Sequence, residues 1–229
     1  MQHLAIIPDG NRRWAIQNKL ASFLGHQRGV DVVRTAITFC IKNSIKYLSF
    51  YTFSLENFRR SETEKNYLFN NLLRDCFIKE LPELIKNGVR VRFLGEQSLF
   101  PEDLRETIHH IETETKHLDV LHLNLLFCYG ATLEITQAVK KIAQQVRDGL
   151  LSVESIDEST VRNALWTGDI PDPDLIVRTG GVVRLSNFLL FQAAYSEFAF
   201  LDCYWPDVTE EKLGHCVDQF NKTKRNFGK

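Results

Sequence analysis

Polar and charged side chains gather at three places in the sequence, each directly after an apolar run. A carboxylate can hold a divalent metal ion, backbone N–H groups at a helix N-terminus favour anions, and paired guanidinium groups bind phosphate oxygens. Together these groups suit a diphosphate, so we interpret the clusters as parts of a site in a phosphate-handling enzyme. The clusters are residues 9–13, 54–60 and 178–186.

The first cluster follows the apolar residues 4–7 and Pro8. This order predicts a buried strand, a tight turn and the start of a helix. Taken alone, an Asp-Gly-Asn turn is more often only a turn, but arginines at two other predicted strand ends favour an anion site. The members of the cluster that we expect to act are Asp9, Gly10, Asn11, Arg12 and Arg13.

Three further polar residues are open to more than one interpretation. His26, in a Gly-His pair just before a predicted helix, could be a phosphate ligand or a helix-capping side chain. Asn57, considered alone, is more often a residue that satisfies a turn. Glu197 lies between Tyr195 and Phe198, and a carboxylate in such apolar surroundings needs a partner. An ion pair and metal ligation are both open for Glu197.

The composition is that of an ordinary soluble protein. Hydrophobic residues make up 44% and charged residues 25% of the 229, which fits one α/β domain over residues 1–229 better than two very small ones. Lys plus Arg number 28 against 29 Asp plus Glu, so no basic field marks a nucleic-acid binder. No apolar run reaches the roughly 18 residues of a membrane span, and we see no signal peptide. Five scattered cysteines without a CxxC pair favour reduced thiols, so we expect a cytoplasmic protein.

Strand-like and helix-like periodicities alternate along the chain. Repeated strand–helix–strand units predict an α/β fold with a mostly parallel central sheet flanked by helices. Ligands bind beyond the carboxyl ends of such strands, so the three clusters could converge. The expected strands are residues 4–7, 47–53, 89–95, 120–128, 174–177 and 197–201. The expected helices are residues 19–43 after a short connector, 61–86 with a kink or interruption at Pro82, 101–116, 132–149, 157–166, 186–195 and 210–222.

A group of large apolar residues comes from the central strands and the long helical segment 61–86. Ordinary core packing is the more common explanation for such a group. A hydrophobic tunnel beside the anion site is the sharper alternative, and it would suit a substrate with a charged head and a long hydrocarbon tail. The residues are Phe50, Phe53, Phe69, Leu72, Leu73, Phe93, Leu121, Leu123 and Leu125.

Several long motifs occur in the order found in one known family. They are residues 3–15, Gly25-His26, 53–58, 178–181, 184–190, 195–197 and 204–207. On these motifs the chain resembles the cis-prenyltransferases, close to bacterial undecaprenyl diphosphate synthase.

The resemblance implies head-to-tail condensation of isopentenyl diphosphate onto an allylic primer such as farnesyl diphosphate, with a new cis double bond at each step. The product would be a long-chain polyprenyl diphosphate such as the lipid carrier of cell-wall synthesis. The resemblance also implies Mg²⁺ as cofactor and a homodimer, for which residues 198–205 are the expected interface. The product belongs in a membrane, so transient membrane association would follow.

The resemblance also implies roles for individual residues. Asp9 would hold magnesium and assist departure of the allylic diphosphate, and Glu197 would hold the magnesium of isopentenyl diphosphate. Asn57 corresponds to the proposed proton acceptor, although an amide is a poor base, and Leu121 lies where the tunnel floor would be. The primer side would comprise Gly10, Asn11, Arg12, Arg13, Trp14 and His26. The other substrate-facing residues would be Ser54, Leu55, Glu56, Phe58, Arg60, Arg178, Arg184, Leu185 and Ser186.

Three positions depart from the family pattern. Val182 replaces a usual glutamate, Ser22 replaces a usual arginine, and Phe58 stands where tryptophan is commoner. The alternative to an active enzyme is a catalytically silent homologue that binds isoprenoid diphosphates or partners an active subunit. Silent members tend to lose the first-strand aspartate, so the presence of Asp9 favours the enzyme. The sequence lacks the GxxxxGK[ST] loop of phosphotransferases and the cysteine loop of a phosphatase.

Overall fold

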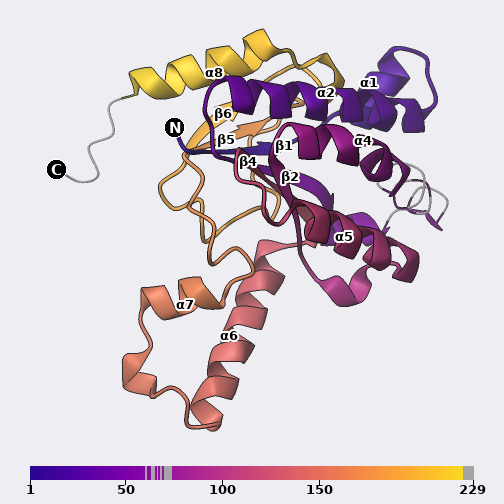
Figure 1. Cartoon of the computed structure of the whole chain (residues 1–229). Coiled ribbons are helices and arrows are strands. Elements are labelled where there is room, and N and C mark those ends of the chain that lie inside the picture. Colours follow the sequence, from indigo (N-terminus) through magenta and orange to yellow (C-terminus); the bar gives the residue numbers. More distant parts are fainter. Residues whose placement is uncertain (60, 63–64, 66, 68, 70–73, 224–229) are drawn as a thin grey trace.

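The computed structural model describes residues 1–223 except residues 60, 63–64, 66, 68 and 70–73 (Figure 1). Its centre is a six-stranded sheet in which every strand pairs in parallel with its neighbours, in the order β3-β4-β2-β1-β5-β6. The expected α/β fold with a parallel sheet is therefore confirmed. The strands are β1 (His3–Ile7), β2 (Tyr47–Ser54), β3 (Val89–Leu94), β4 (Leu121–Tyr129), β5 (Leu175–Arg178) and β6 (Glu197–Phe200).

Helices α2, α4, α5 and α8 pack on one face of the sheet, and α6 and α7 extend away from it (Figure 1). Pro82 lies inside α4 and does not interrupt it, whereas part of the expected segment 61–86 lies outside the described residues. No helix in the described part of the chain is both long enough and apolar enough to span a membrane. The helices are α1 (Asn11–Gln17), α2 (Ser22–Lys42), α4 (Asp75–Lys86), α5 (Glu102–Thr115), α6 (Ala131–Arg147), α7 (Glu158–Ala164) and α8 (Glu210–Lys222).

Apolar runs form the central strands because both faces of a parallel sheet are covered. Successive side chains of a strand point to opposite faces, so the two faces divide β1 between them. Leu4 and Ile6 belong to a large core beneath α2, α4 and α8. Ala5 and Ile7 belong to a smaller core with Phe188 on the other face.

The expected helix over residues 186–195 is wrong. Ser186, Asn187 and Leu189 have φ of 52°, 65° and 44°, and this left-handed backbone cannot continue a right-handed helix. Tertiary contacts hold the loop instead. Asn187 accepts hydrogen bonds from the first N–H groups of α6, and Phe188 stacks on Tyr51 with ring centroids 4.9 Å apart. The loop thereby fixes Ser186 at the edge where the strands end.

Candidate active site

The three polar clusters meet beyond the carboxyl ends of β1, β2 and β5, around a cavity of about 990 Å³. β2 and β5 flank β1, and parallel strands end at the same edge of a sheet. Residues that are far apart in the sequence therefore face one space, which we call the strand-end cavity. Its lining includes Asp9, Gly10, Asn11, Arg12, Arg13, His26, Ser54, Glu56, Asn57, Arg178 and Ser186.

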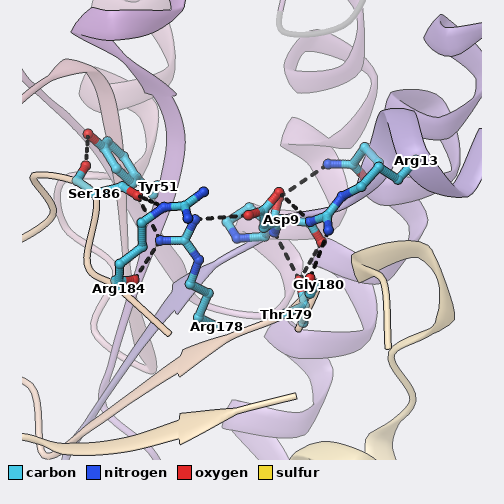
Figure 2. Close-up of polar contacts among 10 residues, drawn as sticks. Asp9, Arg13, Tyr51, Arg178, Thr179, Gly180, Arg184 and Ser186 are labelled. Atoms are coloured by element: carbon cyan, nitrogen blue, oxygen red, sulfur yellow. Dashed lines mark hydrogen bonds and ion pairs between the residues drawn. The ribbon is translucent and has the colours of Figure 1, made fainter. Parts of the chain in front are cut away.

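Asp9 is held between two arginines (Figure 2). Arg178 donates from NH2 to Oδ2 at 2.9 Å, and Arg13 donates from NH2 to Oδ1 at 3.2 Å. The Thr179 hydroxyl accepts from the Asp9 N–H at 2.9 Å and donates to the Asp9 carbonyl oxygen at 2.6 Å. Backbone and carboxylate are thus both fixed, so the cavity presents a positioned acid with a cation on each oxygen.

Arg178 is almost fully buried, with 4% of the residue exposed. Its guanidinium donates to Ser186 Oγ at 2.8 Å and to the Arg184 carbonyl oxygen, in addition to Asp9. Arg184 Nε also donates to Ser186 Oγ, at 3.2 Å. Two guanidinium groups therefore share one hydroxyl (Figure 2), an arrangement that can bind the oxygens of a phosphate.

Two glycines allow the backbone to approach these cations. A Cβ atom on Gly180 would lie 2.4 Å from Arg13 NH2, and the Gly180 carbonyl oxygen accepts from Arg13 NH1 at 2.9 Å. Gly10 has φ of 104°, and a Cβ atom there would lie 2.5 Å from the ring of Tyr204. Gly180 and Gly10 are thus used for close packing at the site.

The segment after β2 forms a short 3₁₀-helix, Leu55–Arg59. The Asn57 side-chain oxygen accepts from the Ser54 N–H at 3.3 Å, so Asn57 does satisfy the turn. Asn187 donates to Glu56 Oε1 at 3.1 Å. Burial alone would raise the pKa of Glu56, but hydrogen bonds from its own backbone, Asn187 and Ser54 outweigh burial and lower it. Glu56 is therefore held as a carboxylate beside the strand-end cavity.

His26 lies within α2, because this helix begins at Ser22, earlier than expected. A side chain in the second turn cannot cap the first turn, so the capping interpretation is wrong. His26 lines the strand-end cavity and also a second, more apolar pocket.

Several expected site residues lie outside the cavity lining. Trp14 donates from Nε1 to Asp207 at 2.7 Å, and Phe58 packs on Phe53 with ring centroids 5.2 Å apart. Leu185 packs against the smaller core, and Leu55 lies against Gly130. Arg60 lies outside the described residues.

Glu197 lies away from the strand-end cavity within one chain. It begins β6 and pairs with Leu175 at the start of β5, whereas Phe200 pairs with Arg178 at the cavity end. Three residues of strand, about 10 Å, separate these two levels of the sheet. The register therefore does not bring Glu197 and Asp9 together.

A buried carboxylate that the sequence did not reveal as important is Glu134, which is 1% exposed. It accepts hydrogen bonds from the Tyr129 hydroxyl, from both the N–H and the hydroxyl of Thr167, and from Gln192. Gln192 belongs to the loop that carries Ser186, so Glu134 ties this loop to α6 and β4. Neither a repeat of acidic residues nor a spacing typical of metal ligands marks Glu134 in the sequence.

Asp9 is the carboxylate in the cavity that could hold Mg²⁺. Mg²⁺ is usually bound through one or two protein carboxylates, with water and substrate phosphates completing its coordination. In the described part of the chain no group of three or more His, Cys, Asp or Glu forms a metal site of its own. Within that part, the buried atoms Arg178 Nε and Asn11 Oδ1 have no hydrogen-bond partner, and both residues line the cavity. A carboxylate beside one unused donor, Arg178 Nε, and one unused acceptor, Asn11 Oδ1, fits a metal ion that arrives with a phosphate ligand.

Comparison with protein families matches residues 7–228 to the prenyltransferase family described as "Putative undecaprenyl diphosphate synthase". The match includes Asp9 and all three polar clusters. The chain belongs to this family. The resemblance inferred from the motifs is therefore confirmed, as is the enzyme class, cis-prenyltransferase.

Similar curated proteins match along almost the whole chain. The tritrans,polycis-undecaprenyl-diphosphate synthase (geranylgeranyl-diphosphate specific) of Thermoplasma volcanium is 42% identical over 100% of this chain and 89% of its own length. An isoprenyl transferase of Agrobacterium fabrum is 42% identical over 99% of this chain and 92% of its own length.

Two solved structures of the same fold match over the full chain. Lavandulyl diphosphate synthase from Lavandula x intermedia, in complex with dimethylallyl diphosphate, has a TM-score of 0.95 at 33% identity, over 100% of this chain and 98% of its own. An enzyme from Campylobacter jejuni described as "a probable undecaprenyl diphosphate synthase" has a TM-score of 0.82 at 33% identity, over 100% and 99%. The family match and the matches to solved structures thus agree with each other.

Proposed function

We propose that the protein condenses isopentenyl diphosphate sequentially onto an allylic diphosphate, with farnesyl diphosphate as primer, to give a long-chain cis-polyprenyl diphosphate. The observation that carries this proposal is the strand-end cavity, where Asp9 lies between Arg13 and Arg178 and an apolar pocket opens beside it. Such a substrate requires a cavity that binds its diphosphate and an adjoining apolar pocket that takes its hydrocarbon chain.

The primer diphosphate is assigned to the side of Asp9, Gly10, Asn11, Arg12, Arg13 and His26. Departure of the diphosphate builds negative charge on the leaving oxygens, and arginines already in place stabilise that charge without reorganising. Asp9 and the substrate oxygens would hold Mg²⁺, which when bound supplies further stabilisation of the leaving group. Asp9 also holds the Arg13 and Arg178 side chains in place beside the proposed site of the leaving diphosphate.

Isopentenyl diphosphate is assigned to Arg178, Arg184 and Ser186, which already contact one another. The double bond of this substrate would then lie near Asn57 and Glu56, which line the same cavity. Because the Asn57 oxygen is engaged with the Ser54 N–H, we assign Asn57 to positioning. The isopentenyl unit loses a proton as its double bond shifts, and this proton passes to water or to the released diphosphate.

The hydrocarbon tail is assigned to the apolar pocket of about 300 Å³ between α2, α4 and the sheet. Pro8, Asn11, His26 and Thr52 line both this pocket and the strand-end cavity, so the two spaces adjoin. Its apolar wall includes Val33, Ile37, Phe50, Phe77, Leu123 and Leu125. This pocket is our candidate for the expected tunnel.

Leu121→Trp is expected to shorten the dominant product by at least one isoprene unit. Leu121 pairs with Val89, which lines the pocket, and it lies on the same face of β4 as the lining residues Leu123 and Leu125. A larger side chain there fills the far end of the pocket. Product length is measured by chromatography after exhaustive extension of labelled primer.

The matched control is Leu126→Trp, the same change on the opposite face of β4, in the smaller core. It should cost about 1–3 kcal/mol of stability, as overpacking does, and leave product length unchanged. Equal product lengths for wild type and Leu121→Trp would show that the tail does not reach this level of the sheet.

Glu134→Gln is expected to raise KM for isopentenyl diphosphate roughly 10-fold while kcat changes less than about threefold, because a hydrogen bond to a charged group contributes about 1.5–3 kcal/mol. Four donors point at this carboxylate, and glutamine offers one acceptor oxygen. The loop with Ser186 would lose its anchor while Asp9 is untouched. Steady-state kinetics with each substrate varied separately measures this split.

Asp148→Asn, at the exposed C-terminal end of the same helix, is the control for Glu134→Gln and should leave both constants unchanged. A fall in kcat with an unchanged KM would instead place Glu134 in the chemical step.

A homodimer is also proposed, with the surface near β6 as its interface. Tyr195 is 75% and Phe198 43% exposed there, whereas Trp205 is 1% exposed. Trp205 donates to the Gly29 carbonyl oxygen at 2.9 Å, so the expected interface over residues 198–205 must exclude this residue. Glu197 lies beside these exposed rings, and a second chain is needed to bring it to a magnesium site.

Purified protein with Mg²⁺ and labelled isopentenyl diphosphate tests the proposed function. Dimethylallyl, farnesyl and geranylgeranyl diphosphate serve as primers, since the relatives named above differ in the allylic compound that their descriptions mention. We expect extension of farnesyl diphosphate. No incorporation with any primer over a wide range of Mg²⁺ would favour the silent homologue.

A further inference from the structure

Two helices form opposite walls of the apolar pocket. Val33 and Ile37 come from α2, and Phe77 and Leu84 come from α4. The sheet closes the third side with Leu123 and other residues of β2, β3 and β4. The distance between α2 and α4 therefore sets the width of the pocket.

Arg34 and Glu80 join these two helices and themselves line the pocket. Arg34 donates from Nε to Glu80 Oε2 and from NH2 to Glu80 Oε1, both at 2.8 Å. Its remaining nitrogen NH1 donates to Asp31, one turn earlier on α2. Two parallel bonds between a guanidinium and a carboxylate form the most directional kind of ion pair.

The ion pair is stronger than an ordinary surface pair. The Glu80 side chain is only 20% exposed, and that of Arg34 44%. Hydrogen bonding to Glu80 is the main reason why the pKa of Arg34 lies above its usual value. The two parallel bonds therefore link the helices unless the helices move apart.

The pocket is small for a long hydrocarbon. A cavity of 150 Å³ takes one benzene ring, or about 25 Å³ per carbon. By that measure the pocket of about 300 Å³ holds roughly a dozen carbons. A longer tail needs more room than the α2–α4 ion pair leaves between the helices.

We propose that the Arg34–Glu80 ion pair must open before a hydrocarbon tail of more than roughly a dozen carbons, the farnesyl primer included, can extend between α2 and α4. The inference rests on the proposed function, because it takes the apolar pocket as the site of the tail. It adds a specificity-determining pair that does not touch the reacting atoms.

The test measures binding, so that it does not depend on turnover. Saturated alkyl diphosphates of increasing chain length are titrated, below their micelle concentrations, into wild type, Arg34→Gln, Glu80→Gln and the double variant. For wild type we expect affinity to rise with length up to roughly a dozen carbons and then to level off. Each additional buried CH₂ contributes about 0.8 kcal/mol, so variants with a widened pocket should bind the longest compound at least about 10-fold more tightly than wild type does.

The double variant should behave like either single variant, because both changes remove one interaction. Lys42→Gln is the matched control. It breaks an ion pair of 3.0 Å from the same helix α2 to Glu210 of α8, away from the pocket. Thermal melting of every variant verifies that each one folds.

Levelling off at the same chain length in wild type and all folded variants would overturn the proposal, as would an equal change in Lys42→Gln. A failure of the proposed function looks different. In that case the alkyl series would still separate the variants from wild type, while no primer would be extended.

Discussion

Asp9→Ala lowers the rate of isopentenyl transfer by about 10³-fold, the loss typical of removing one group that stabilises transition-state charge. This is the largest effect that we expect from a single substitution. Asp9 is the carboxylate assigned to Mg²⁺, and its two oxygens orient Arg13 and Arg178. Removing it also leaves Arg178, 4% exposed, without its carboxylate partner. The initial rate of labelled isopentenyl diphosphate incorporation, at saturating Mg²⁺, measures the loss.

Asp9→Asn should be nearly as slow, because the amide keeps the shape of the side chain and loses its charge. Asp169→Ala is the control. It removes an exposed carboxylate that pairs with Arg92 at 2.7 Å and lies outside the cavity lining. An Asp9→Ala enzyme within about tenfold of wild type would exclude Asp9 from the role we assign to it.

Arg178→Lys is expected to lower kcat/KM for isopentenyl diphosphate at least about 100-fold, the second-largest effect. Arg178 contacts Asp9, Ser186 and the Arg184 carbonyl oxygen with one planar group, and the lysine ammonium cannot reach these three in the same geometry. The expected loss corresponds to about 2.7 kcal/mol of transition-state stabilisation. It is measured by varying isopentenyl diphosphate at saturating primer.

Arg184→Lys provides the comparison, because Arg184 is exposed and its side chain contacts only Ser186 among the contacts described above. Its loss should be smaller and confined to KM. If Arg178→Lys retained wild-type kcat/KM, the buried guanidinium would have a structural role rather than the substrate-binding role proposed here.

Much of the fold follows from local patterns in the sequence. Apolar runs such as residues 4–7 and 174–177 became strands because both faces of the sheet are covered, and alternating helices forced the strands to be parallel. The final helix, Glu210–Lys222, has the bounds expected from its periodicity. The loop at residues 186–195 was not predictable, since its left-handed residues are held by α6 and Tyr51.

The candidate site was predictable where a charged side chain lies at the end of an apolar run, as Asp9 and Arg178 do. Residues that act through tertiary contacts gave no such signal. In the helix expected over residues 132–149 the apolar Val139 is 56% exposed, whereas the acidic Glu134 is buried. Only the three-dimensional position of its four donors explains a buried carboxylate there. The Arg34–Glu80 pair is similarly invisible in the sequence, because its members are far apart along the chain.

The central claim is that the cavity around Asp9 and Arg178 forms a cis double bond between an allylic primer and isopentenyl diphosphate. The most direct measurement is NMR of the product of one condensation, with farnesyl diphosphate and ¹³C-labelled isopentenyl diphosphate. We predict a single new double bond of cis geometry, joined head to tail, and none in Asp9→Ala under the same conditions. A trans double bond, a branched junction, or an unchanged yield from Asp9→Ala would contradict this account.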